Sequence, residues 1–293
     1  MKVGLFALSI GTGARPLTIQ RTAEAAERTG ISTLWVGEHV VLFDRHASRY
    51  PYSQSGQFAV PSDSDWLDPF VTLTYAAAFT SRIRLATGIC LLPEHHPLVL
   101  AKQIASLERL SGGRFTFGVG VGWLAEEFAA LGLPFERRAQ RAVEYLNVMR
   151  KLWTEEVTTF DGEFVKFEGA RSFSKPAQGA RLPVFFGGES APALKRVAEH
   201  GNGWHGFNLD PDEARAKIAK LHAMLRENGR DPKEIEVAIS PYNKRITPDG
   251  LKRYRDAGVD EVVIVTAPPQ DESQVTVWVE RLAEKWVQPA SKL

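Results

Sequence analysis

Short apolar segments rich in β-branched residues alternate along the chain with longer segments in which apolar residues recur every three or four positions. Val262-Val263-Ile264-Val265 is apolar at every position, as expected for a parallel strand that is buried on both faces. Segments of this kind predict eight β-strands, at residues 3–8, 33–37, 83–90, 114–119, 182–186, 203–207, 235–239 and 261–265.

The segments between these strands have helical periodicity. Between the first two strands, Ile19, Ala23 and Ala26 form one apolar face, and Gly30 follows as a C-terminal cap. About eight strand-helix repeats, with no linker rich in Pro, Gly or Ser, predict an α/β fold that is a single (β/α)₈ TIM barrel over residues 1–293. A doubly wound sheet is the weaker alternative.

Two segments, at about residues 38–66 and 124–183, are predicted to be insertions at the C-terminal face of the barrel. The second contains Asp161-Gly162 between two short apolar runs, a dipeptide typical of tight hairpin turns. Loops at the C-terminal ends of barrel strands are where substrates are selected. We therefore expect these insertions to shape a binding site.

Composition narrows the classes of partner. The chain has 36 basic and 35 acidic side chains, which excludes a whole-molecule electrostatic attraction to nucleic acid. Residues 1–10 predict a first strand rather than a signal peptide, and no apolar segment approaches the ~20 residues that cross a bilayer. The single cysteine, Cys90, excludes an intrachain disulfide and favours the cytosol. We expect a cytoplasmic protein without a nucleic-acid or membrane partner.

Candidate chemistry lies where the predicted strands end. Glu38-His39 follows the second strand, a position that faces the mouth of a barrel. An imidazole beside a carboxylate can take or give a proton near neutral pH. This pattern predicts His39 as a general acid or base supported by Glu38. A histidine that is hydrogen-bonded in a structural loop is the alternative.

Two glycine-rich segments follow the fourth and fifth strands. In Gly118-Val119-Gly120-Val121-Gly122-Trp123, a tryptophan stands where a dinucleotide fingerprint needs its third glycine, so the segment indicates a sharp turn or the close approach of a flat ligand. Gly187-Gly188-Glu189-Ser190 opens a helix, whose free backbone N–H groups favour an anion. Ser190 acting only as an N-terminal cap is the alternative.

Other catalytic groups are not indicated. His95 and His96 are adjacent and diverge in direction, and the remaining histidines form no ligand-spaced set, so we predict no metal site. A Gly-x-Ser-x-Gly elbow is missing, and Cys90 within an apolar run is predicted to be a small core residue. A barrel mouth with an acid or base but no nucleophile or metal is typical of a site in which a bound cofactor carries the chemistry.

A series of motifs resembles one known family. They are Glu38-His39-Val40, Tyr50-Pro51-Tyr52-Ser53, Leu85-Ala86-Thr87-Gly88, Leu92-Pro93 with His96-Pro97, Leu110-Ser111-Gly112-Gly113-Arg114, Gly118 through Trp123 with Glu127-Phe128, Leu152-Trp153, Gly187-Gly188 and Gly203-Trp204. In order and spacing they resemble the bacterial luciferase-like superfamily. More narrowly, they are similar to its coenzyme F-420-dependent branch, the LLM-class oxidoreductases. The resemblance covers residues 1 to about 210.

The resemblance implies a TIM barrel with the deazaflavin F-420 at its mouth, and a homodimer. It implies a non-prolyl cis peptide bond between Gly88 and Ile89, forming a bulge behind the cofactor ring. It also implies that His39 occupies the acid or base position of sugar- and alcohol-oxidising relatives. The other implied cofactor residues are Gly120, Gly122 and Trp123 along the ring or side chain, and Gly187, Gly188, Glu189 and Ser190 at the phosphate.

Two departures from the family pattern bear on function. Phe43 stands where sugar phosphate-oxidising members have an indole, so substrate identity does not carry over. Val121 stands where FMN-using monooxygenases have a phosphate-binding arginine, which favours the deazaflavin. We expect an oxidoreductase that transfers a hydride between F-420 and a small organic substrate, in a direction that the sequence leaves open.

Three alternatives remain open from the sequence. The nearest is an FMN-dependent luciferase-like monooxygenase that uses reduced flavin and oxygen. A non-catalytic flavin- or deazaflavin-binding protein comes second, and the presence of His39 argues against it. A metal-dependent barrel hydrolase comes third.

Overall fold

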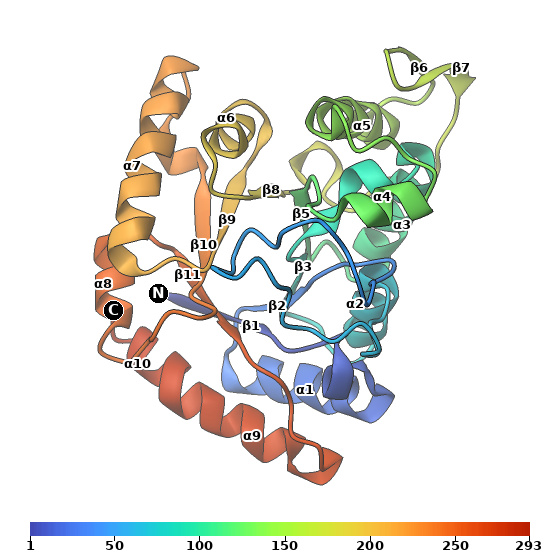
Figure 1. The fold of residues 1–293 in the computed structure, drawn as a ribbon. Helices are drawn as coiled ribbons and strands as arrows, with labels where there is room; N and C mark the ends of the chain where they lie inside the picture. The colour runs from blue at the N-terminus through green and yellow to red at the C-terminus, as the bar shows by residue number, and fades with distance from the viewer.

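Eight parallel strands form a closed barrel (Figure 1) in the computed structural model, which describes residues 1–293. The strands are β1 (Lys2–Phe6), β2 (Thr33–Val36), β3 (Arg84–Thr87), β5 (Phe115–Gly120), β8 (Val184–Gly187), β9 (Gly203–Phe207), β10 (Glu236–Ser240) and β11 (Glu261–Val265). Each pairs with the next in this order, and β11 pairs with β1 to close the ring. The predicted TIM barrel is confirmed.

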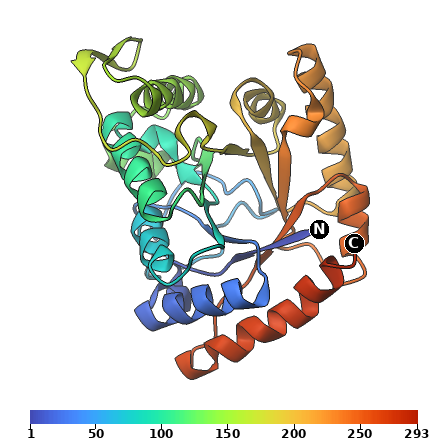
Figure 2. The same cartoon turned by 180° about the vertical axis from the view of Figure 1, so that it is seen from behind.

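Helices surround the barrel on all sides (Figures 1 and 2). They are α1 (Pro16–Thr29), α2 (Pro69–Ala77), α3 (Pro97–Leu110), α4 (Ala125–Ala130), α5 (Arg138–Thr154), α6 (Ala191–His200), α7 (Pro211–Glu227), α8 (Leu251–Asp256), α9 (Val275–Leu282) and α10 (Gln288–Ala290). The left-handed conformation of Gly30, with φ of 84°, ends α1 as predicted. None of these helices has the length and apolar character needed to cross a membrane.

The apolar side chains form two layers. A cluster of 57 buried residues lies mainly between the strands and the helices, and a small cluster that includes Trp35 and Phe185 fills the barrel interior. Trp35 fits because Gly4 on the neighbouring strand has no side chain: a Cβ there would lie 2.8 Å from the indole Nε1. That Nε1 donates to the buried carboxylate of Glu261 at 3.2 Å. The interior is therefore a packed core, and the site lies at one end of it.

The predicted third strand is interrupted. It forms β3 and then the two-residue β4 (Cys90–Leu91), which pairs with the end of β5. A cis peptide bond between Gly88 and Ile89 separates the two, as the family resemblance implied. Cys90 is fully buried, in agreement with its prediction as a core residue. A second cis bond, which the sequence did not indicate, joins Phe173 to Ser174.

The first insertion, residues 38–66, contains no helix or strand and crosses the C-terminal end of the barrel, in blue in Figure 1. Trp66 forms an isolated antiparallel bridge with Ile10, just after β1. On the far side of the barrel, the side-chain amide of Asn208, after β9, donates to the backbone oxygen of Tyr52 at 3.2 Å. The loop is therefore attached on both sides of the barrel mouth.

Only part of the second predicted insertion, residues 124–183, is an addition to the barrel. Its longest helix, α5, packs against α3 and is a regular member of the outer ring. The additions are α4 and the antiparallel hairpin of β6 (Thr158–Asp161) and β7 (Lys166–Ala170), which projects from the edge of the molecule (Figures 1 and 2). The hairpin was predicted from Asp161-Gly162. The helical period of α5 was present in the sequence but could not distinguish an outer-ring helix from an inserted one.

Candidate active site

The segments that carry the predicted site residues follow β2, β3, β5 and β8. Because all four strands are parallel, their C-terminal ends meet at one end of the barrel. The structure thus brings together Glu38-His39, Gly88-Ile89, the turn after Gly120, and Gly187 through Ser190. Each of these segments is separated from the next by about 30 to 65 residues in the sequence, and their convergence follows from the fold.

Ile89 lies between two of the predicted glycines. A Cβ at Gly120 would lie 1.5 Å from Cδ1 of Ile89, and a Cβ at Gly187 would lie 3.0 Å from its Cγ2. Any side chain at Gly120 would displace Ile89. In this structure, these glycines make room for the side chain at the cis bulge, a role that the sequence prediction of close ligand approach did not include.

Gly122 forms the turn beyond β5. Its φ is 75°, and a Cβ there would lie 2.7 Å from Cε2 of Phe128 and 3.0 Å from Oε1 of Glu94, so both backbone conformation and space require glycine. The guanidinium Nε of Arg138, at the start of α5, donates to the carbonyl oxygen of Gly122 at 3.2 Å. An arginine from another element therefore reaches the turn that contains Val121, the position at which the family resemblance implied an arginine in FMN-using members.

His39 is paired with Glu127, on α4. Its Nδ1 lies 2.7 Å from Oε2 of Glu127, a fully buried carboxylate. Oε1 of Glu127 accepts from the backbone N–H groups of Val40 at 2.5 Å and Val41 at 3.1 Å. Because a carboxylate can only accept, Nδ1 carries the hydrogen, and Nε2 of the neutral ring has a free lone pair. This is the arrangement of a general base that is oriented by a carboxylate.

The prediction that Glu38 supports His39 is wrong in its geometry. Oε1 of Glu38 lies 2.9 Å from Nε2 of His95, and Oε2 accepts from the N–H of Leu91 at 2.6 Å. Burial favours the neutral acid, but the His95 imidazole and the Leu91 amide outweigh it and lower the pKa of Glu38. Burial lowers the pKa of His95, but the hydrogen bond to Glu38 and the Glu38 charge outweigh it, and the pKa of His95 is raised. Glu38 therefore holds the segment after the cis bulge.

Glu38, Cys90 and His95 present three potential metal-ligand atoms within 4.8 Å of one another. No sequence pattern indicates this group, because its members come from two different strand ends. Hydrogen bonds to His95 and to a backbone amide already occupy both oxygens of Glu38. The expectation that no metal binds remains a prediction.

Aromatic rings enclose His39. Its ring centroid lies 5.3 Å from Phe58, 5.0 Å from Trp66 and 5.9 Å from Trp123. The His39 side chain is only 7% exposed as a result. The indole that the family pattern places near Phe43 is missing there, but Trp66 and Trp123 supply two indoles from other parts of the chain. The surroundings of His39 are therefore apolar and largely closed to water.

The predicted anion site has the geometry of a capped helix. The Oγ of Ser190 accepts from the N–H of Ala193 at 3.3 Å, which confirms Ser190 as the N-cap of α6. Gly188, with φ of 100°, precedes it. The Glu189 carboxylate accepts from the N–H of Phe207 at 2.8 Å, and burial raises its pKa to about 7. An ionised Glu189 would repel an anion, so only its backbone suits the predicted phosphate site.

Glu94 is an acidic residue that sequence reasoning missed. It is 8% exposed, and neither carboxyl oxygen has a hydrogen-bond partner. Burial, then the charges of Glu127 and Glu38, raise its pKa to about 9, although Arg141 opposes them. Glu94 is therefore a neutral acid at pH 7, packed beneath the Gly122 turn. Its burial depends on α4 and α5, and no local sequence pattern indicates it.

Comparison with known proteins agrees with this architecture. The sequence model of the luciferase-like monooxygenase family matches residues 1–242, and the chain belongs to that family. An uncharacterized protein of Mycobacterium tuberculosis is 37% identical over 287 residues, which cover 96% of this chain and 98% of that protein.

Two solved structures illustrate the range of the fold. The coenzyme F-420-dependent tetrahydromethanopterin reductase from Methanopyrus kandleri has a TM-score of 0.75 and 20% identity over 98% of each chain. The oxygenating constituent of 3,6-diketocamphane monooxygenase from Pseudomonas putida, in complex with FMN, has a TM-score of 0.74 and 16% identity over 97% of each chain. At these identities the likeness shows the fold alone.

The buried acid gives a prediction about stability. The folded protein keeps the Glu94 proton up to about pH 9, whereas the unfolded chain loses it near the ordinary value of 4.5. Stability from this group is therefore fully present below pH 4.5 and is lost as pH rises to 9, at about 1.4 kcal/mol per pH unit. Gln cannot ionise. The free energy of unfolding of Glu94→Gln, measured in urea, should therefore rise relative to that of the wild type by about 1.4 kcal/mol per pH unit between pH 5 and 9.

Glu136→Gln is the matched control, because Glu136 is exposed and should show no such gain. A difference between Glu94→Gln and wild type that stays constant with pH would show that Glu94 is ionised in the folded protein.

Proposed function

We propose that this protein is an oxidoreductase that transfers a hydride between coenzyme F-420 and a small organic substrate at the barrel mouth. The observation that carries the proposal is the His39–Glu127 pair, which leaves Nε2 of a largely enclosed imidazole free for proton transfer. Oxidation of an alcohol, or reduction of a carbonyl, moves one proton together with the hydride, and such a pair can move that proton.

The residues at the mouth fit a deazaflavin. Gly120 and Gly187 leave the side chain of Ile89 as a small apolar platform, suited to the face of a flat ring. The N-terminus of α6, capped by Ser190, suits a phosphate group, and Arg138 adds a positive charge at the Gly122 turn. Bound F-420 would supply a ring carbon, C5, that exchanges a hydride and resists oxygen chemistry.

The chain's own residues have distinct roles in this proposal. Nε2 of His39 takes the hydroxyl proton of an alcohol, or gives a proton to a carbonyl oxygen in the reverse direction. Glu127 holds the ring orientation and stabilises the imidazolium that forms. Phe58, Trp66 and Trp123 exclude water and so strengthen the electrostatic interaction of this pair.

An FMN-dependent monooxygenase is the second candidate, favoured by a specific observation. Arg138 donates to the Gly122 turn, so a guanidinium is near the place where the FMN-using relatives have an arginine. The family description and the FMN complex of the diketocamphane enzyme agree with this candidate. Val121 in the turn, and the likeness to the F-420-dependent reductase, support the deazaflavin.

A cofactor titration distinguishes the two candidates. F-420 and FMN are added separately to the purified protein, and binding is followed by the absorbance change and by displacement of one cofactor with the other. We expect F-420 to bind more tightly and FMN to fail to displace it. Tight FMN binding without affinity for F-420 would reject the deazaflavin and favour the monooxygenase.

Substitution of the paired residues tests the mechanism. With F-420 and a panel of alcohols and ketones, His39→Ala should lower kcat by about 10²- to 10⁴-fold, the usual contribution of a general acid or base. Glu127→Gln should also lower kcat, because the amide cannot stabilise the imidazolium. The dissociation constant of F-420 should change little in either variant. His96→Ala, at an exposed histidine, is the control, and unchanged turnover in His39→Ala would remove His39 from the mechanism.

A further inference from the structure

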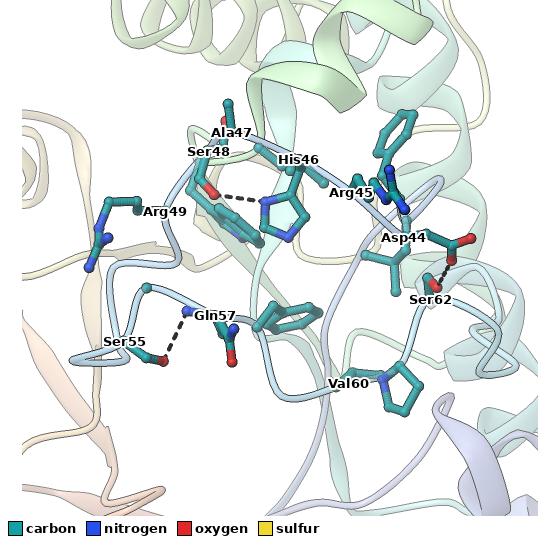
Figure 3. Close-up of a pocket in the computed structure, with 17 residues that line it drawn as sticks. Asp44, Arg45, His46, Ala47, Ser48, Arg49, Ser55, Gln57, Val60 and Ser62 are labelled. Carbon is teal, nitrogen blue, oxygen red and sulfur yellow. Dashed lines mark hydrogen bonds between the residues drawn. The ribbon is translucent and has the colours of Figure 1, made fainter.

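A cavity of about 660 Å³ lies inside the 38–66 loop, between two limbs at residues 42–49 and 55–62. Trp123 and Leu124, after β5, complete its lining. The volume is within the usual range of small-molecule sites. In Figure 3, His46 points from the first limb into the space between the limbs, and Gln57 lies on the second limb.

The first limb is fixed at both ends by consecutive carboxylates of α4. Glu127 accepts from the backbone N–H groups of residues 40 and 41. Oε1 of Glu126 accepts from the N–H groups of Ala47 at 2.6 Å and Ser48 at 3.2 Å. Across the cavity, the hydroxyl of Ser62 donates to Asp44 (Figure 3). These bonds give the cavity wall a defined shape although it contains no helix or strand.

The cavity adjoins the reaction centre. Phe58 and Trp123 line it, and the same two rings lie 5.3 Å and 5.9 Å from the ring of His39. The ring of His46 lies 5.5 Å from Trp123. Trp123 therefore contacts both histidines, and with Phe58 it borders both the cavity and His39.

His46 provides a directed polar group in the cavity. Its Nδ1 lies 2.7 Å from the backbone oxygen of Ser48, so Nδ1 carries the hydrogen, and Nε2 of the neutral ring is an acceptor. Arg45 and Arg49 are exposed at the rim. The lining is mixed: large apolar side chains such as Leu42, Phe43, Phe58 and Trp123 form one part of it, and the exposed polar residues Asp44, Ser55 and Gln57 form another.

We propose that this cavity binds the non-reacting end of the substrate, which is a neutral alicyclic or aromatic group with a hydroxyl that donates to Nε2 of His46. The apolar part of the lining suits the body of such a group, His46 selects the hydroxyl, and the charged side chains of the lining are exposed to solvent. This inference rests on the proposed function, because the substrate extends past Phe58 and Trp123 to reach His39. His46 is then a specificity-determining residue that takes no part in hydride transfer.

Three probes of similar size test the cavity in the cofactor-free protein: p-cresol, 4-methylanisole and p-toluate. Affinities are measured by NMR titration, and intermolecular NOEs locate the probe. We expect p-cresol to bind five- to tenfold more tightly than 4-methylanisole, the contribution of one hydrogen bond. We also expect NOEs from p-cresol to the rings of Trp123 and Phe58.

Variants assign the preference to His46. His46→Phe should bind p-cresol and 4-methylanisole equally, and His46→Gln should keep part of the preference through its carbonyl oxygen. His96→Phe, at an exposed histidine without a side-chain hydrogen bond, should match the wild type. Far-UV circular dichroism verifies that each variant folds. If His46→Phe does not fold, the test depends on the NOEs between p-cresol and the rings of Trp123 and Phe58 in the wild type. Their absence overturns the proposal.

Equal binding of p-cresol and 4-methylanisole by the wild type, or a hydroxyl preference that survives in His46→Phe, would also overturn it. Tightest binding of p-toluate would show an anion site formed by the rim arginines instead. The probe experiment uses no cofactor, so a negative result does not bear on F-420 binding. Likewise, a negative F-420 titration does not change what the probe experiment says about the cavity.

Discussion

The hydrogen bond between Nδ1 of His39 and the buried carboxylate of Glu127 connects the chemistry of this protein to its architecture. Glu127 also accepts from the amides of Val40 and Val41, so one side chain fixes both the imidazole and the start of the loop that covers it. Its neighbour Glu126 fixes the same loop at Ala47 and Ser48. Helix α4 is therefore the support from which the site and its cover are held.

The fold could be predicted from the sequence because most barrel strands stand out as short apolar segments. Parallel strands buried on both faces are apolar at nearly every position, and β9 and β11 match the predicted segments at both ends. The cis bond at Gly88-Ile89 followed from the family resemblance. The break between β3 and β4 did not follow from periodicity, because Leu85-Ala86 before the bulge and Ile89-Cys90 after it are both apolar.

The site was predicted less completely, for a geometric reason. Glu38 and His39 lie just beyond the end of β2, and although they are adjacent in sequence they reach different partners, His95 and Glu127. The carboxylate for His39 had to come from another element, and an acidic pair in the first turn of a short helix, Glu126-Glu127, was the available signal. Glu94 carried no such signal, because its burial arises only after α4 and α5 pack around it.

Glu127 fixes the ring of His39 with the hydrogen on Nδ1 and a free lone pair on Nε2. Nitrogen NMR of the ¹⁵N-labelled protein, with His39 assigned by comparison with His39→Ala, reports the hydrogen on each ring nitrogen directly. We expect neutral His39 to be protonated at Nδ1 in the wild type and the two tautomers to mix in Glu127→Gln. A wild-type ring protonated at Nε2 would overturn this assignment, because the free lone pair would then face Glu127.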